Sequence, residues 1–453
     1  MRNLPNGWTK APLDTFTIEC NQHIPGETEE FKYIDIGSVN RDTKRIETPQ
    51  SLIGKDAPSR ARKHVRAGDV LVSMTRPNLN AVALVPDDLD GQIASTGFDV
   101  LRTPGIDPRW VFNLVRTSAF VEAMSDLVQG ALYPAVRSKE IRSFEAPLAP
   151  LHEQKRIADK LDAILARVDA CRERLDRIPG ILKRFRQAVL VAAISGKLTE
   201  EWRNINNRNM LQWVQLTIGQ LITGIEAGLN VQCIERPPKA DEQGLVKISA
   251  VTWGRYNDSE SKTLPLGKDV PEATRIRKGD FLISRANTLE LVGACVIVDN
   301  VLRPIFLSDK ILRLVMPGHI KSWLLYTLRS PAGRRQIETL ASGNQLSMRN
   351  LSQASLRSIT IPMPPDDERK EIIRRIESLF AYADRLEARY AATRAQVDKL
   401  IPATLAKAFR GELVPQDPND EPASVLLERL GAATASAATK RRRSKSVNSA
   451  TGS

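Results

Sequence analysis

The sequence is poor in the residues that build covalently linked or metal-based cores. Its 453 residues include only four cysteines, Cys20, Cys171, Cys233 and Cys295. The cysteines form no C-x-x-C pair and have no histidine at zinc-ligand spacing, which argues against a disulfide scaffold and a structural zinc site. We therefore expect a protein of the reducing cytoplasm.

Long apolar segments are also missing. The longest run, AVLVAAI at 188–194, is far shorter than the roughly 20 residues that cross a bilayer. The first residues, MRNLPNGWTKAP, contain no apolar signal core. We expect no association with a membrane.

Motifs that hold cofactors or activate nucleophiles are absent as well. There is no phosphate-binding G-x-x-x-x-G-K-[ST], no G-x-G-x-x-G after a strand and no Asn-Pro-Pro-aromatic stretch. The four histidines share no metal spacing. PPDDERK at 364–370 resembles a metal-dependent nuclease motif, but its acidic groups lie too close together in the chain to reach one cation in that way. Asp366, Asp367 and Glu368 fit the start of a helix better, and Glu153 fits the same role in the first half.

Positive charge is in excess. Lys and Arg number 66 against 53 Asp and Glu, which gives a formal net charge of +13. A basic surface attracts polyanions, nucleic acid before anionic membrane. Aromatic residues make up only 5% of the chain, which argues against a platform that stacks single-stranded bases.

The chain also repeats itself at offsets of 211 to 215 residues. RAGDVLVS at 66–73 returns as RKGDFLIS at 277–284, VLR at 100–102 as ILR at 311–313, PLAPLHEQ at 147–154 as PMPPDDER at 362–369, and SGKL at 195–198 as RGEL at 410–413. Such self-similarity indicates a duplicated structural unit. Each unit begins with short β-rich runs separated by Gly, Pro, Asn and Asp, which predicts mixed α+β bodies over 1–150 and 201–365.

Each unit continues as a predicted long helix, over 151–200 and 366–414. Apolar residues recur there at alternating steps of 4 and 3: Ile157, Leu161, Ile164, Val168, Cys171, Leu175, Ile178, Leu182 and Phe185, then Ile372, Ile376, Leu379, Ala383, Leu386, Tyr390, Thr393, Val397 and Leu400. This spacing predicts a coiled-coil seam. The alternative is an amphipathic helix lying on its own body, with a period nearer 3.6 and a wider apolar face. Pro179 and Pro402 should kink or interrupt these helices unless packing compensates.

Polar loops of the two bodies contain side chains of the types that bind nucleic acid. Arg, Asn and Gln make paired hydrogen bonds to base edges, and Lys and Arg neutralise phosphates. The candidates are Arg60, Arg62, Lys63, Arg76, Asn78, Asn80, Tyr133, Arg137, Arg285, Asn287, Asn344, Gln345 and Arg349. Residues 415–453 form a polar, partly disordered basic tail that includes KRRRSK at 440–445.

The order of these segments resembles a known family. A body, a P-x-x-P-x-x-E-Q segment, a long helix and a GKL end, repeated twice, are similar to the specificity subunit of type I restriction–modification systems. LPNGW at 4–8, PLAPLHEQKRI at 147–157 and ISGKLTEEWR at 194–203 carry the resemblance most closely. The second copy departs from the pattern, with Arg369 where the first copy has Gln154.

The resemblance implies an α+β fold with two target recognition domains, separated by two long helices that form an antiparallel coiled coil. Each domain would read one half of a bipartite, asymmetric target in double-stranded DNA. The helices would set the spacing and dock two methyltransferase subunits, and restriction subunits would join the complex. S-adenosylmethionine, ATP and Mg would bind those partners, and this chain would have no cofactor and no active site.

Two other interpretations stay open at this point. The chain could be a basic coiled-coil scaffold that binds DNA without sequence preference, or the specificity part of a related fused restriction enzyme. A scaffold would show no specificity ratio in competition binding. A fused enzyme would methylate DNA without a partner.

Overall fold

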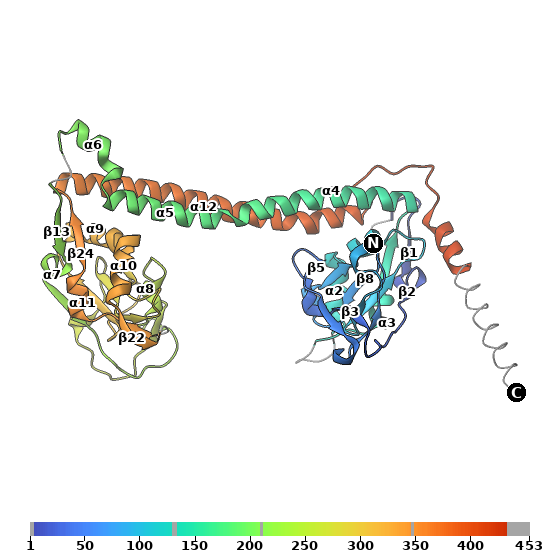
Figure 1. Cartoon of the computed structure of the whole chain (residues 1–453), viewed down its shortest axis with the longest axis horizontal. Coiled ribbons are helices and arrows are strands. Elements are labelled where there is room, and N and C mark those ends of the chain that lie inside the picture. The colour runs from blue at the N-terminus through green and yellow to red at the C-terminus, as the bar shows by residue number, and fades with distance from the viewer. Residues whose placement is uncertain (1–3, 129–133, 209–211, 346–347, 433–453) are drawn as a thin grey trace. The chain divides into compact units, whose positions relative to one another are not determined.

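The computed structural model describes residues 4–128, 134–208, 212–345 and 348–432. The chain divides into two compact units (Figure 1). Unit 1 comprises Met1–Asp176 and Ala391–Ser453, and unit 2 comprises Arg177–Tyr390. Each unit therefore combines a β-rich body with one stretch from each long helical segment.

The body of unit 1 is built on two four-stranded sheets. The first sheet is antiparallel and has the order β2 (Ile18–Glu19), β11 (Phe98–Arg102), β8 (Val70–Ser73), β9 (Val82–Leu84). The second has the order β6 (Gln50–Ile53), β3 (Glu30–Ile34), β10 (Ile93–Ser95), β7 (Ala61–His64), with β3 and β10 parallel. The other elements are β1 (Thr9–Pro12) paired with β12 (Glu145–Leu148), the hairpin β4 (Val39–Asn40) and β5 (Arg45–Ile46), and the helices α1 (Pro108–Leu114), α2 (Ser118–Asp126) and α3 (Ser138–Arg142).

The body of unit 2 contains a four-stranded antiparallel sheet and two three-stranded sheets. Their orders are β14 (Gly224–Ala227), β21 (Ile311–Val315), β17 (Phe281–Ser284), β19 (Cys295–Ile297); β16 (Ser261–Thr263), β15 (Gly244–Val246), β20 (Ile305–Phe306); and β18 (Ala286–Asn287), β23 (Met348–Asn350), β22 (Ser342–Gln345). The other elements are β13 (Val214–Thr217) paired with β24 (Thr360–Met363), and the helices α6 (Glu200–Ile205), α7 (Ile218–Leu221), α8 (Ser249–Thr252), α9 (Gly318–Arg329), α10 (Pro331–Leu340) and α11 (Gln353–Ser358).

The main sheets of the two bodies have the same design. The order β2-β11-β8-β9 in unit 1 corresponds to β14-β21-β17-β19 in unit 2. All four residues of β8 and all four of β17 are buried, which explains why both strands are continuous apolar runs rather than alternating ones. The sequence repeat is thus a repeat of the structural framework.

The repeated R-x-G-D motif forms a turn that binds a neighbouring strand. Gly68 has a φ of 82° and Gly279 a φ of 88°, which glycine adopts without steric cost. In unit 1 the buried carboxylate of Asp69 accepts hydrogen bonds from the backbone N–H of Arg66 at 2.8 Å and from the guanidinium of Arg102 at 2.6 Å. In unit 2 the equivalent carboxylate accepts the same two kinds of bond, from Arg277 at 2.8 Å and Arg313 at 2.9 Å. This shared pair explains why VLR and ILR repeat together with R-x-G-D.

The two predicted long helices differ at their prolines: the first is interrupted beside Pro179, as expected, and the second continues through Pro402. The predicted helix over 151–200 is two helices, α4 (Leu151–Asp176) and α5 (Ile178–Ile194). Pro179 lies in the first turn of α5, where its missing N–H costs nothing. The second helix, α12 (Asp366–Ala408), ends before the predicted 414 but continues through Pro402. The neighbours Ile401 and Leu405 pack into the core of unit 1, which compensates for the hydrogen bond lost at the proline.

The predicted seam residues are buried to different degrees. Ile157, Leu161, Val168, Ile372, Ile376 and Val397 are buried, and Ile164, Leu175, Leu379 and Leu386 are half-buried. In α4, Leu165 is more buried than Ile164, and Cys171 is exposed. In α12, Thr393 is exposed, and Leu400 is 47% exposed while the adjacent Ile401 packs against the core. The strict 4,3 pattern is wrong at these positions, because an α-helix with 3.6 residues per turn drifts away from a 3.5-residue repeat when it also packs on a globular body.

Each unit contains an antiparallel pair of helical segments. In unit 1, Arg172 of α4 bonds to Asp398 of α12 at 2.9 Å, and four residues later Asp176 pairs with Arg394, four residues earlier in α12. In unit 2, Arg186 of α5 bonds to Asp384 and Glu387 of α12, each at 2.7 Å. Ile157, Leu161 and Leu165 also share one hydrophobic cluster with the body helix α1 and with the end of α12. The predicted α+β fold with antiparallel long helices is confirmed, and α4 packs on its own body as well as on α12.

The segment 415–432 is an ordered part of the region predicted as a polar, partly disordered tail. Residues 423–432 are helical, and Ala423 and Leu426 are buried in the core of unit 1. The backbone N–H of Ala423 donates to the carbonyl of Gly7 at 2.9 Å, and Asp420 pairs with Arg156 of α4 at 2.6 Å. Buried apolar contacts and an ion pair hold the segment, although its composition is polar. The basic run at 440–445 lies outside the described residues.

Candidate nucleic-acid interface

In unit 2, one small sheet brings the predicted binding residues together. Asn287 on β18 lies opposite Arg349 on β23, and β23 pairs in turn with β22, which contains Asn344 and Gln345. Arg285 comes directly before β18, and its carbonyl accepts the N–H of Leu351 at 2.8 Å. Five residues that the sequence places in two separate loops therefore lie on or beside one sheet, and the side chains of Arg285, Asn287 and Arg349 make it a polar site.

Two guanidinium groups on or beside this sheet have hydrogen-bonding capacity that no carboxylate in the described part of the chain uses. Among the described residues, neither Arg285 nor Arg349 forms an ion pair with a carboxylate. Arg349 is half-buried, and its Nε–H lies buried with no hydrogen-bond acceptor in the described part of the chain. A buried donor without an acceptor costs about 1–3 kcal/mol, which a ligand oxygen or nitrogen can relieve. The site is suited to an anionic or acceptor-rich ligand.

In unit 1, the predicted loop residues gather around a strained turn. Arg76 and Asn80 both have left-handed backbones, with φ of 49° and 46°. Thr75 forms a β-bridge with Ala135, and the N–H of Arg76 donates to Pro134 O at 2.8 Å. These bonds place Arg76 and Asn78 beside the segment that leads to Arg137, and all three side chains are exposed. Strained non-glycine residues of this kind concentrate at functional sites.

The remaining predictions in unit 1 have mixed outcomes. Arg60 is exposed, and the N–H of Thr96, in the turn that also binds the 74–80 loop, donates to its carbonyl at 2.8 Å. Arg62 and Lys63 are half-buried on β7. Asn80 already donates its amide to Val115 O at 2.8 Å, so that donor supports the fold. Tyr133 lies outside the described residues.

The two polar sites occupy the same place in the shared framework. The 74–80 loop directly follows β8, and Arg285–Asn287 directly follow β17, the equivalent strand. In both units a later segment, 134–137 or β23, bridges to that loop. The framework therefore presents different side chains from one equivalent edge.

The sequence-based prediction missed the basic hairpin β4–β5. Arg41, Lys44 and Arg45 lie beside a cavity of about 1150 Å³ in unit 1, which α2, α4 and the end of α12 also line. The ammonium of Lys44 donates to Asn80 O at 2.6 Å, and burial, together with the nearby guanidinium of Arg116, lowers the pKa of Lys44 to about 8. Burial likewise lowers the pKa of Arg116 to about 10. The basic stretch NRDTKR at 40–45 was the available signal.

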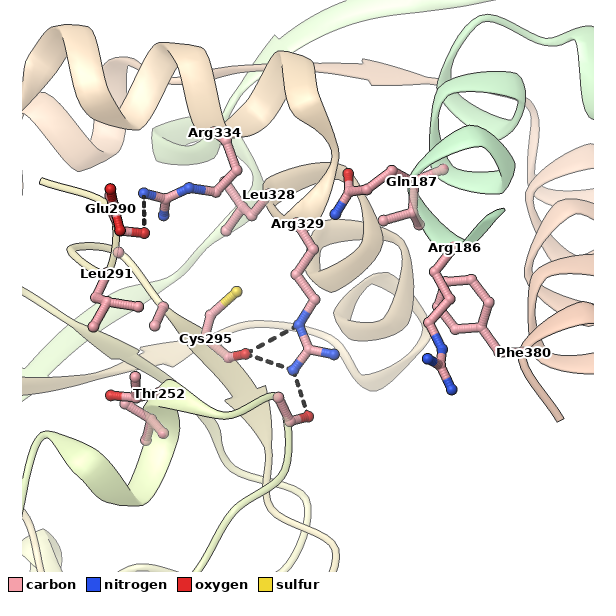
Figure 2. A pocket seen from close by; sticks show the side chains of 15 residues that line it. Arg186, Gln187, Thr252, Glu290, Leu291, Cys295, Leu328, Arg329, Arg334 and Phe380 are labelled. Atoms are coloured by element: carbon pink, nitrogen blue, oxygen red, sulfur yellow. Dashed lines mark hydrogen bonds between the residues drawn. The ribbon is translucent and has the colours of Figure 1, made fainter. Parts of the chain in front are cut away.

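A pocket of about 320 Å³ in unit 2 has a structural character (Figure 2). Its two central arginines are committed to backbone carbonyls: Arg329 donates to Cys295 O and Gly254 O, both at 2.7 Å, and Arg334 donates to Val292 O at 2.6 Å. Burial raises the pKa of the Cys295 thiol, which suppresses the thiolate. These groups hold loops in place and leave no activated nucleophile among the described residues that line the pocket.

The glutamates at the starts of the long helices are structural. The indole N–H of Trp8 donates to Glu153 at 3.0 Å, and that of Trp213 donates to Glu368 at 2.8 Å. Both carboxylates are 1% exposed. The helix-start interpretation of PPDDERK agrees with α12 beginning at Asp366, but the tryptophan partners were not foreseen. The sequence feature that could have indicated these partners is the single tryptophan in each of LPNGW and LQWVQL.

Two structural features are missing from the described part of the chain. No helix there is both long and apolar enough to cross a membrane. Across the same described ranges, no cluster of three or more His, Cys, Asp or Glu side chains is arranged to hold a metal ion.

The chain is similar to proteins of known type. No family model matches it. It is 28% identical to the type I restriction enzyme EcoKI specificity subunit of Escherichia coli K12, over 97% of this chain and 98% of that protein. It is 31% identical to the EcoBI specificity subunit of Escherichia coli, over 67% of each.

Solved structures give the same result. A chain from a study of the complex assembly and conformational transition of a type I R-M system matches with a TM-score of 0.73 and 26% identity, over 91% of this chain and all of that one. The HsdS subunit from Thermoanaerobacter tengcongensis matches with a TM-score of 0.58 and 25% identity, over 91% of this chain and 98% of that one.

Proposed function

This chain belongs to the specificity subunits of type I restriction enzymes, and we propose that it selects the DNA sequence on which such an enzyme acts. Each body reads one half of a bipartite target in double-stranded DNA. The paired helices connect the two readers and provide the docking surface for two modification subunits. Restriction subunits join this complex.

The observation that carries this proposal is the equivalent edge that follows β8 and β17. A shared framework of buried strands and R-x-G-D turns supports this edge in both bodies. The exposed or half-buried side chains differ: Arg76 and Asn78 in unit 1, and Arg285, Asn287 and Arg349 in unit 2. Constant geometry with variable side chains is what recognition of two different half-sites requires.

The chemistry of these side chains suits base edges in the major groove. Arg pairs with guanine O6 and N7, and Asn pairs with adenine N6 and N7. Since the two sets differ, the two half-sites should differ, and the complete target should be asymmetric. The shape and deformability of the DNA add to the readout, so the side chains alone do not spell the sequence.

The reactions take place on the partners in this proposal. S-adenosylmethionine binds the modification subunits, which methylate adenine, and ATP and Mg serve the restriction subunits. The specificity chain contributes recognition and spacing and has no catalytic residue. The committed arginines and the protonated thiol of the unit 2 pocket support this assignment.

The test is to map methylated adenines in cells that express this chain with its modification subunits. The expected result is one bipartite, asymmetric motif that is absent when the chain is omitted. Exchanging residues 1–150 for those of another family member should alter one half of the motif only. Methylation without a motif would indicate a non-specific scaffold, and methyl transfer by the purified chain alone would indicate a fused enzyme; either result overturns the proposal.

A further inference from the structure

Unit 2 has a strongly basic corner at the end of β17 opposite to Arg285. Arg275, Arg277 and Lys278 lie before β17, and Arg303 lies in the loop after β19. Together with neighbouring residues of 272–278 and 300–304 they line a hollow of about 380 Å³. We call these four residues the basic corner.

The positive charge of this corner is poorly compensated. Glu272 is the acidic residue of the lining, and it meets Arg275 and Arg277 only at 3.4 Å, on an exposed surface. Within the described ranges, Lys278 and Arg303 form no ion pair. Exposed pairs of this length contribute little, so Glu272 does not cancel the field of four cations.

The equivalent corner of unit 1 has the opposite charge. In both units the residue directly after the edge strand, β9 or β19, donates its N–H to the aspartate carbonyl of R-x-G-D, Val85 to Asp69 and Val298 to Asp280, each at 2.9 Å. The loop that follows reads PDDLDG in unit 1 and DNVLRP in unit 2. In unit 1 the loop therefore presents three exposed aspartates, which are Asp87, Asp88 and Asp90.

One hydrogen bond shows how this inversion of charge arises. Asp90 accepts the backbone N–H of Ala67 at 2.9 Å and so closes the R-x-G-D turn of unit 1 with a negative charge. In unit 2 the corresponding turn residue is Lys278, and the corresponding loop contributes Arg303. The backbone framework is retained, and the net exposed charge changes sign, although Arg66 stays exposed in unit 1 and Asp299 in unit 2.

We propose that the basic corner of unit 2 binds backbone phosphates of the DNA, an interaction that unit 1 lacks. The inference rests on the proposed function for its ligand. Arginine and lysine side chains around an open hollow are the usual phosphate-neutralising groups. The four residues of β17 separate this corner from the base-reading edge by about 13 Å. This distance is close to the width of about 12 Å of the major groove, so one duplex is large enough to meet both.

The inverted charge favours DNA over a modification subunit as the occupant. Two copies of one modification subunit present the same surface to both units, so their docking sites should be alike in charge. A corner that is basic in one unit and acidic in the other cannot serve two identical partners equally. The half-sites of the DNA, in contrast, differ between the units.

The experiment measures the salt dependence of DNA binding by the complex of the full chain with its modification subunits. The variant carries Arg277→Gln, Lys278→Gln and Arg303→Gln, and the matched control carries Arg66→Gln, the unit 1 counterpart of Arg277. Fluorescence anisotropy gives Kd over a salt series for a duplex that contains the mapped motif and for a random-sequence duplex. Of the substituted residues, Arg66, Arg277 and Lys278 are exposed and Arg303 is half-buried. Circular dichroism verifies that the variants fold.

The variant should bind both duplexes more weakly, with the slope of log K against log salt reduced by about 0.9 for each phosphate that it no longer neutralises. The methylated motif should stay the same, and the Arg66→Gln control should keep the wild-type slope. An unchanged slope in the variant overturns the inference, as does weaker assembly with the modification subunits at unchanged DNA affinity. Because the random-sequence duplex is included, the inference can fail or hold separately from the proposed function, which fails if wild type prefers no motif.

Discussion

Glu153 and Glu368 hold equivalent positions in the two copies of the repeat but have different surroundings. Each is buried and accepts a bond from a tryptophan indole. Glu368 also accepts from Thr199 at 2.8 Å and from the guanidinium of Arg203 at 2.5 Å. Among the described residues Glu153 has no such further partners, and its Oε1 is buried without a hydrogen bond. The tryptophan–glutamate pair belongs to the duplicated framework, whereas the second half of the site is specific to each unit.

The segment that follows each helix explains the difference. In unit 2, residues 199–203 lie shortly after α5, which ends at Ile194, and contribute polar and charged groups. In unit 1, the chain after α12 contributes apolar groups instead: the ring of Phe409 lies 4.6 Å from that of Trp110, and Gly411 packs close to Pro5. The equivalent carboxylates thus differ: Glu368 belongs to a charged hydrogen-bond network in unit 2, and Glu153 is an isolated buried acid in unit 1.

The largest expected effect is on unit 2. Glu368→Gln removes the negative charge beside the buried Arg203 and should destabilise unit 2 by about 3 kcal/mol, because an uncompensated buried cation is costly. The matched variant Glu153→Gln should change unit 1 by about 1 kcal/mol or less, because no buried cation of the described chain pairs with Glu153. Hydrogen exchange resolved by peptide reports the free energy of opening for each unit separately. Equal losses in both units would contradict the comparison.

The next effect distinguishes two neighbouring residues of α12. Ile401→Asp places a charge against the core of unit 1 and should cost about 2–4 kcal/mol. Leu400→Asp, on the exposed face, should change the stability by about 0.5 kcal/mol at most. Thermal unfolding of the two variants tests this order. A larger loss of stability at Leu400 would support the strict 4,3 spacing of the predicted seam.

A smaller effect separates two asparagines of the 74–80 loop. Asn78→Ala should leave stability unchanged and weaken discrimination in the unit 1 half-site by about 1–3 kcal/mol, as expected when a paired hydrogen bond to a base is removed. Asn80→Ala should lower stability by about 1 kcal/mol, because it removes the bond to Val115 O. Competition binding against single-base changes, combined with unfolding curves, measures both. If Asn78→Ala leaves every base preference intact, this residue is not a reader.

The smallest effect is on the pH dependence of unit 1. Burial raises the pKa of Glu153 above its ordinary value of 4.5. The folded state therefore binds this proton more tightly than the unfolded state, and the stabilising contribution is lost as pH rises from 4.5 through the folded-state pKa. The difference in opening free energy between wild type and Glu153→Gln should follow this direction. A difference that does not vary with pH would show that the carboxyl is equally ionised in both states.

Particular residues show how far the sequence could go. The R-x-G-D repeat, the start of α12 at Asp366 and the α+β bodies were predictable, since local patterns carry them. The antiparallel arrangement of the long helices was expected only from the family resemblance. The gathering of Asn287 with Arg349 was not, because strand pairing between segments about 60 residues apart leaves no local trace. Burial of Leu165 in place of Ile164, and of Ile401 in place of Leu400, depends on which surface the helix meets.

The sequence by itself determined that the chain is a duplication with two bodies of different loop composition, because hydrophobic spacing and turn motifs are local and survive divergence. Only the tertiary structure decided which polar residues share a surface, which carboxylate has a cation beside it and which corner is basic. Those properties depend on residues that are distant in the chain and adjacent in space. Electrostatic and hydrogen-bond energies depend on the distance between groups in space and on their burial. Neither quantity can be read from the order of residues in the chain.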